Sequence, residues 1–125
     1  MTALAARYPY EAPVTAYGNG GFRFAEMSHK GSILCMPGGV YAWEPISAEN
    51  LAPQDFARVL EELTPPCVLL LGTGDKQIFP SADLVKAFAD KGLGLEAMST
   101  GAAARTYNVL LAEKRHVAAA LIAVA

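Results

Sequence analysis

The chain has 125 residues, of which 53% are hydrophobic and 18% charged, and its formal net charge is −2. This length suits one domain with a buried core and is too short for two ordinary domains, and the composition excludes a disordered chain. The slight negative charge also argues against a nucleic-acid-binding protein, which would carry a basic face.

Residues 1–15 are expected to form an extended N-terminal arm, because Pro9 and Pro13 interrupt them and no periodic pattern is present. The same interruptions argue against a signal peptide. The longest apolar run, Val117–Ala125, is shorter than the roughly 20 residues that a membrane-spanning helix needs. We therefore expect a soluble, cytoplasmic protein that does not span a membrane and whose single domain covers residues 16–125.

The first third of this domain is predicted to be a β-meander. Gly18–Gly21 form a turn signal, and the alternation that follows in Phe22–Phe24 is typical of a hairpin strand. A second turn is expected at His29–Gly31 and a third at Pro37–Gly39, so "SILCM" and "VYAW" are read as further strands of the meander.

Residues 53–63 are predicted to form an amphipathic helix with Phe56, Val59, Leu60 and Leu63 on its apolar face. "CVLLL" then has the pattern of a central strand that is buried on both faces. A second helix is expected after an N-cap at Ser81, with an apolar face of Leu84, Val85, Phe88 and Ala89.

"LGLEAM" is predicted to be a strand and "AAARTYNVLLAEK" a helix. Helix propensity would extend that helix through "VAAALIAV", whereas a βαβ arrangement requires a strand there, so the two criteria conflict. The predicted core contains Val68, Leu70, Leu84, Phe88, Tyr107 and Leu111, with the Tyr107 hydroxyl hydrogen-bonded.

Four segments resemble a known family: "AYGNGGFRF", "GSILCMPGGVYAW", "LLLGTGDKQIFP" and "GAAARTYNVLLAEKRHVAAALIAV". Together they are similar to the Mth-type domain of unknown function, which includes a respiratory complex I assembly factor and an adipogenesis-associated protein. The resemblance spans residues 14–125. It implies an α/β fold of three layers with a mixed central sheet, in which the N-terminal meander is followed by a βαβαβ unit and the last segment is a strand.

The sequence departs from this family at two positions. Ser99 stands where relatives often have aspartate, and Ala104 stands where many have cysteine. A catalytic role for that aspartate or that thiol therefore does not carry over to this chain.

Gly72, Thr73 and Gly74 follow the central strand, where glycines let backbone N–H groups approach an anion. The third glycine of a dinucleotide fingerprint is missing, because Gln77 stands in its place, and no P-loop lysine follows. The alternative to an anion-binding loop is a tight strand exit lined by small residues.

Ser99 and Thr100 begin the third helix and are expected to lie beside this loop, since both follow parallel strands. They would serve either as helix caps or as part of a ligand site. Arg105 and Asn108 share one face of the same, otherwise apolar helix. Arg105 is interpreted as a buried tie to backbone carbonyls, Glu96 or Glu113, or alternatively as an anion-binding group in the cleft.

No catalytic group, metal site or cofactor is expected. Cys35 and Cys67 lie in apolar runs without a partner at metal-ligand spacing, and neither His29 nor His116 is next to a nucleophile.

Two functional hypotheses follow. The resemblance implies a non-enzymatic binding or assembly factor that presents a surface to protein partners at or near the inner membrane, such as respiratory assembly proteins. The alternative is an enzyme or sensor that binds a small anionic metabolite at the edge formed by Gly72–Gly74 and Ser99–Arg105. The first needs an exposed apolar patch, whereas the second needs a concave pocket with convergent titratable groups.

Overall fold

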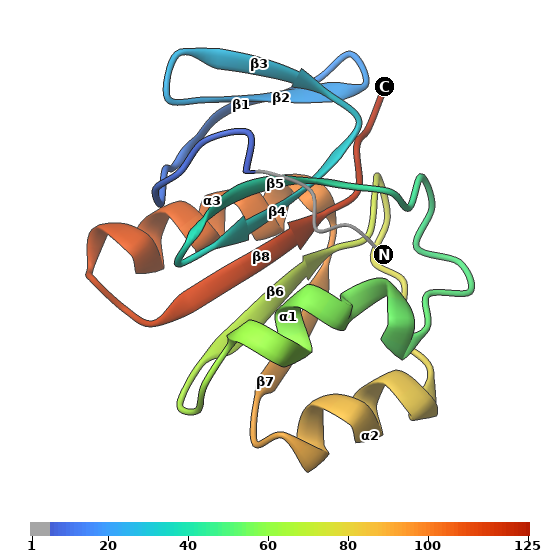
Figure 1. The fold of residues 1–125 in the computed structure, drawn as a ribbon. Coiled ribbons are helices and arrows are strands. Elements are labelled where there is room, and N and C mark those ends of the chain that lie inside the picture. Colours follow the sequence, from blue (N-terminus) through green and yellow to red (C-terminus); the bar gives the residue numbers. More distant parts are fainter. Residues whose placement is uncertain (1–5) are drawn as a thin grey trace.

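A five-stranded sheet in the order β5-β4-β8-β6-β7 forms the centre of the computed structural model, which describes residues 6–125 (Figure 1). β6 pairs in parallel with β7 and β8, whereas β4 pairs antiparallel with β5 and β8. The sheet is therefore mixed, as expected. Its strands are β4 (Ser32–Met36), β5 (Gly39–Trp43), β6 (Val68–Gly72), β7 (Gly94–Met98) and β8 (Val117–Leu121).

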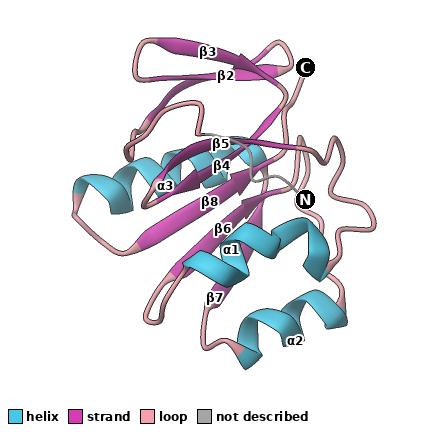
Figure 2. Cartoon of the chain, viewed as in Figure 1, coloured by secondary structure: helices cyan, strands magenta, loops and turns pink. Residues whose placement is uncertain are grey.

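Helices cover both faces of this sheet. A short 3₁₀ helix, η1 (Pro53–Phe56), leads into α1 (Ala57–Glu62), and α2 (Ala82–Asp90) lies on the same face, while α3 (Thr100–Ala112) lies on the other (Figure 2). Ser81 caps α2 as predicted, because its hydroxyl accepts a hydrogen bond of 3.2 Å from the N–H of Leu84. α2 and α3 connect β6, β7 and β8, so the βαβαβ unit is confirmed.

A second sheet of three antiparallel strands lies beside α3 and contains β1 (Val14–Gly18), β2 (Gly21–Phe24) and β3 (Met27–Lys30). The predicted single meander is therefore wrong in two respects. His29 and Lys30 extend β3 instead of forming a turn, and β4 and β5 belong to the large sheet. The chain turns at Gly31, whose φ is 95°, and all five residues of β4 are buried, which requires cover on both faces.

The two faces of the large sheet each bury a separate apolar cluster. Along β6, Leu69 and Leu71 face α1 and α2, whereas Leu70 faces α3, as the two-residue period of a strand requires. The central position predicted for this strand is therefore confirmed. The structure thus has three layers: α1 and α2, the five-stranded sheet, and α3 with the small sheet.

Most of the predicted core is buried, and the exceptions lie at its margin. Leu70, Leu84, Phe88 and Tyr107 are buried, whereas Val68 and Leu111 are partly buried at the edge of the cluster beneath α3. The predicted apolar face of α2 was too wide. Val85 and Ala89 are exposed, because this helix covers the edge of the sheet and buries only Leu84 and Phe88.

The described part of the N-terminal arm runs along β5. The N–H of Arg7 donates to the carbonyl of Val40 at 2.7 Å, and the N–H of Val40 donates to the carbonyl of Tyr8 at 2.9 Å. The predicted arm covered residues 1–15; residues 1–5 lie outside the described part, and Val14 and Thr15 already belong to β1.

Candidate functional site

The loop after β6 meets the first turn of α3 at Gly72. A Cβ atom at this position would lie 2.9 Å from Cα of Thr100 and 2.9 Å from Cδ2 of Leu121. Only glycine therefore lets the helix approach the end of the strand so closely. The structure thus brings together the two segments that the sequence placed at one edge of the sheet.

Thr73 organises the loop that leads away from β6. Its N–H donates to the carbonyl of Met98 at 2.9 Å, and its hydroxyl accepts a hydrogen bond of 3.0 Å from the N–H of Ile78 and donates to the carbonyl of Lys76. The residue is buried. The polar groups of Thr73 are thus engaged within the protein.

Thr100 joins three elements at the same edge. Its hydroxyl donates to the carbonyl of Ile122 at 2.7 Å and accepts a hydrogen bond of 2.9 Å from the N–H of Gly74, and its own N–H donates to the carbonyl of Gly74 at 2.8 Å. Ser99 caps the helix by accepting a hydrogen bond of 3.4 Å from the N–H of Ala102. Several N–H groups that could have received an anion are therefore bonded to neighbouring loops.

Asn108 and Arg105 have different environments although they share a helix. The side-chain oxygen of Asn108 accepts from the N–H of Val14 at 2.8 Å, and its nitrogen donates to the carbonyl of Val14 at 2.8 Å. Asn108 therefore ties α3 to β1. Arg105, by contrast, is exposed, so the expected burial of its guanidinium is wrong.

Helical geometry explains this correction. The buried side of α3 contains Ala103, Ala104 and Tyr107, and at about 100° per residue Arg105 points to the opposite side, as does the exposed Val109. The sequence predicted that the whole helix is buried because alanines precede Arg105. Alanine, however, occurs on both the buried and the exposed side of a helix and does not distinguish them.

Tyr17 is a neighbour of this region that sequence reasoning missed. A Cβ atom at Gly101 would overlap the Tyr17 hydroxyl and lie 3.4 Å from Nη1 of Arg105. Tyr17 and Arg105 therefore both lie close to Gly101 in the first turn of α3. The only signal in the sequence was a glycine inside a helix, which often marks a close approach by another group.

Tyr107 is a core aromatic residue, as expected, but its hydroxyl has no hydrogen-bond partner within residues 6–125. The prediction of a satisfied hydroxyl is therefore wrong. Burial raises the pKa of this phenol, and the nearby Cys35 and Glu11 raise it further. Burial also raises the pKa of the Cys35 thiol to about 12, so both groups stay protonated at neutral pH. The two cysteines are free buried thiols, as predicted.

Two hollows lie on the surface formed by the described residues. One, of about 280 Å³, lies over the small sheet beside Gly18, Gly21, Arg23 and Lys30. The other, of about 190 Å³, lies between residues 48–51 and 78–81 and reaches Leu71 at the end of β6. In the part of the chain that the structure describes, no cluster of His, Cys, Asp or Glu has the makings of a metal site, and no helix is both long and apolar enough to cross a membrane.

Solved structures share this fold. An outer membrane protein of Bartonella henselae is 48% identical, with a TM-score of 0.89 over 95% of this chain and 100% of that one. A Bordetella pertussis protein described as an Mth938-like domain is 29% identical, with a TM-score of 0.76 over 98% of this chain and 92% of that one. The fold expected from the resemblance is therefore confirmed.

Curated relatives include proteins with and without a described role. An uncharacterized protein of Rhodobacter capsulatus is 34% identical over 88% of this chain and 83% of that protein. NADH dehydrogenase (ubiquinone) 1 alpha subcomplex assembly factor 3 of Xenopus tropicalis is 27% identical over 87% of this chain. A 13 kDa major membrane protein of Francisella tularensis is 36% identical over 47% of this chain.

The chain spans 48% of the Francisella protein and 60% of the Xenopus protein, so it matches only part of each. The model of the family described as "Protein of unknown function (DUF498/DUF598)" matches residues 14–122, which include both sheets and all three α-helices. With nearly its whole length matched, the chain belongs to the DUF498/DUF598 family.

Proposed function

We propose that this chain is a non-enzymatic binding and assembly domain that binds protein partners and supports the biogenesis of a respiratory complex or of other inner-membrane proteins. The proposal is supported by relatives named as complex I assembly factors. Their similarity extends over 87% of this chain in Xenopus tropicalis and 98% in Mus musculus, and therefore involves the whole domain.

The observation in the structure that favours this proposal is that polar groups at the Gly72–Gly74 edge are hydrogen-bonded within the protein. Thr73 and Thr100 bond the loops to one another, so this edge holds three elements together. Large apolar side chains are instead exposed elsewhere, with Ile46 at 89% and Phe79 at 79% exposure. Exposed apolar groups of this kind suit contact with a macromolecule.

Affinity capture tests the proposal. The tagged chain is recovered from native membranes and from cytosol, and its partners are identified by mass spectrometry against a tag-only control. We expect enrichment of respiratory or protein-translocation subunits from the membranes. Recovery of no such subunit above the control would count against an assembly role.

A second candidate function is the binding of a small anionic metabolite, by an enzyme or sensor, at the edge of Gly72–Gly74 and Ser99–Arg105. The observation that favours it is the exposed pair of Tyr17 and Arg105 against Gly101, where a hydroxyl and a guanidinium converge. Thermal denaturation of the parent and of Arg105→Met, with and without phosphate, tests it. Phosphate should raise the melting temperature of the parent only, since a ligand stabilises the state that it binds. A parent insensitive to phosphate removes this candidate.

A further inference from the structure

The smaller hollow lies on the face of the sheet that α1 and α2 cover, at the end of β6. Its walls are residues 48–51 and residues 78–81, and Leu71 reaches it from the strand. Leu51, Leu71 and Ile78 belong to or pack against the apolar cluster beneath these helices. The floor of the hollow is therefore an opening onto the apolar core.

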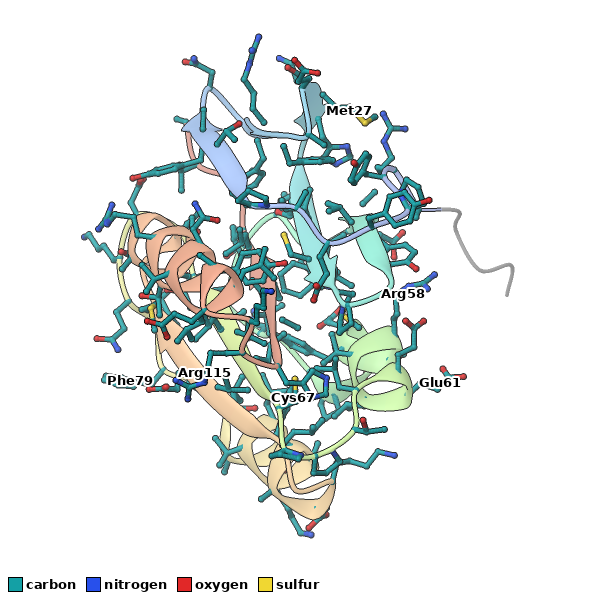
Figure 3. The ribbon with its side chains drawn as sticks, turned by 90° about the vertical axis from the view of Figure 1, so that its left-hand side faces the viewer. Met27, Arg58, Glu61, Cys67, Phe79 and Arg115 are labelled. Carbon is teal, nitrogen blue, oxygen red and sulfur yellow. The ribbon has the colours of Figure 1, made fainter. Side chains whose placement is uncertain are left out.

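The two most exposed large hydrophobic residues stand on the loops that form these walls. Phe79 lines the hollow, is 79% exposed and points outward (Figure 3). Ile46 is 89% exposed and lies two residues before Ala48 in the chain. Val109 on α3 is also exposed, at 57%, but lies on the other face of the sheet and next to neither hollow. The apolar floor is thus continued by the exposed ring of Phe79, and Ile46 adds an exposed apolar side chain to the loop that forms the opposite wall.

Glu49 is the only charged residue among those that line this hollow, and the chain segments that form its walls are mostly acidic. Residues 44–56 contain Glu44, Glu49 and Asp55 and no lysine or arginine, and Glu49 lines the hollow itself. The opposite loop adds Asp75 and one cation, Lys76. Such a surface repels anionic lipid headgroups and attracts cationic groups.

We propose that this acidic apolar hollow binds a protein segment in which apolar side chains are flanked by lysine or arginine. An apolar side chain of the partner fills the space beside Leu71 and Phe79, and its cations face Glu49 and its neighbours. The cytoplasmic ends of membrane-spanning helices have this chemistry, because positive residues are enriched there next to an apolar stretch. The inference rests on the proposed assembly function and specifies the part of the partner that is held.

Binding of defined peptides tests this surface. The probe is a short fluorescent peptide with a leucine- and phenylalanine-rich centre and lysines at both ends, and its counterpart carries glutamate in place of each lysine. We expect the parent protein to bind the lysine peptide, with affinity falling as salt rises, and to bind the glutamate peptide at least about tenfold more weakly.

Two variants remove the features that the proposal requires. Ile46→Ser with Phe79→Ser removes the apolar rim, and Glu49→Lys reverses the charge; each should weaken binding of the lysine peptide about tenfold or more. Val109→Ser on α3 and Glu113→Lys at the C-cap of this helix make the matched changes and should leave binding unchanged. All these sites are exposed, and unchanged melting temperatures verify folding.

Several outcomes would overturn the inference: a parent that binds neither peptide, equal binding of both peptides, or equal losses in the variants and their controls. Binding of phosphatidylcholine–phosphatidylglycerol vesicles through Ile46 and Phe79 would assign the surface to a membrane instead. The capture experiment separates the two proposals. If the Ile46→Ser, Phe79→Ser protein still recovers the partner of the parent, the assembly function stands and this surface does not.

Discussion

Asn108 and Arg105 show how a helical position three residues away changes the role of a polar side chain. Asn108 lies at the flank of the buried side of α3, where the oxygen and the nitrogen of its side-chain amide both bond to the backbone of Val14. Arg105 points outward like Val109. The sequence suggested Arg105 as the tie between α3 and the rest of the fold, whereas Asn108, one helical turn later, forms it.

If Arg105 were buried, its substitution would destabilise the protein more than that of Asn108; the structure predicts the opposite order. Asn108→Ala leaves the N–H and the carbonyl of Val14 without their partner and should lower the free energy of unfolding by about 1–3 kcal/mol. Arg105→Met should change it by less than about 0.5 kcal/mol, because the guanidinium is exposed. Urea unfolding of both variants measures these values, and a larger loss for Arg105→Met would contradict the structure.

The Tyr107 hydroxyl is expected to destabilise the folded state. It is buried without a partner in the described structure, and a buried hydroxyl that forms no hydrogen bond loses its hydration without compensation. Tyr107→Phe should therefore keep or raise the melting temperature, whereas Tyr107→Leu, which also removes the ring, should lower it. If Tyr107→Phe costs more than about 1 kcal/mol, the hydroxyl has a partner, since that is the usual value of a hydrogen bond.

The Thr100 hydroxyl at the start of α3 bonds both the loop after β6 and the segment after β8. Thr100→Val keeps the shape of the side chain but leaves the N–H of Gly74 and the carbonyl of Ile122 unbonded. We expect a loss of about 1–3 kcal/mol for each buried group that remains unsatisfied. Thr100→Ser retains the hydroxyl and should lose less. Equal losses in the two variants, measured by urea unfolding, would show that the methyl group, and not the hydrogen bonds, stabilises this junction.

The central strand should be the element most sensitive to truncation. The side chain of Leu70 on β6 faces α3 and is fully buried. Leu70→Ala should therefore lower the free energy of unfolding by about 2–5 kcal/mol through lost burial and the cavity that remains. Val85→Ala on the exposed side of α2 is the control and should have little effect. An unchanged melting temperature for Leu70→Ala would exclude Leu70 from the core.

Elements with a strong apolar period could be predicted from the sequence, and β3 could not. "CVLLL" and the apolar spacing of residues 53–63 identified β6 and the segment of η1 and α1. β3 reads Met-Ser-His-Lys and alternates partly buried with exposed side chains, so it lacks the apolar residues that mark a strand. It forms because β2 offers it a partner, and that pairing is tertiary information.

At the scale of the whole molecule, topology predicted the place of the candidate site but not its bonding. Parallel strands put Gly72–Gly74 and Ser99–Thr100 at the same edge, and the structure has them there. The partner of the Thr100 hydroxyl lies in Ile122, after β8, and no local pattern connects two residues so far apart in the chain. The exposure of Ile46 and Phe79 could not be predicted from the sequence either, because it depends on how the other elements pack.

The stability of the whole molecule should fall in alkaline solution, because the core holds a thiol that resists ionisation. Burial raises the pKa of Cys35 from 9.0 to about 12, so between these values the folded protein keeps a proton that the unfolded chain has lost. The unfolded state then binds fewer protons, and the free energy of unfolding declines as pH rises through this window, while the contribution is complete below pH 9. One such group contributes a slope of up to about 1.4 kcal/mol for each pH unit.

Denaturant unfolding, followed by Trp43 fluorescence, measures this slope between about pH 8 and about pH 10. Above this range the ionisation of tyrosine would dominate the pH dependence of stability. Cys35→Ala removes the titrating group, so the variant should be less stable throughout but should lose about 1 kcal/mol less than the parent across this window. Tyr107→Phe should remove a smaller part of the slope than Cys35→Ala, because the ordinary pKa of that phenol is 10.0 and the unfolded chain has ionised only about half of it at pH 10. Parallel slopes for the parent and Cys35→Ala, or rapid alkylation of the Cys35 thiol in the folded protein, would show that this thiol is not held in the neutral core.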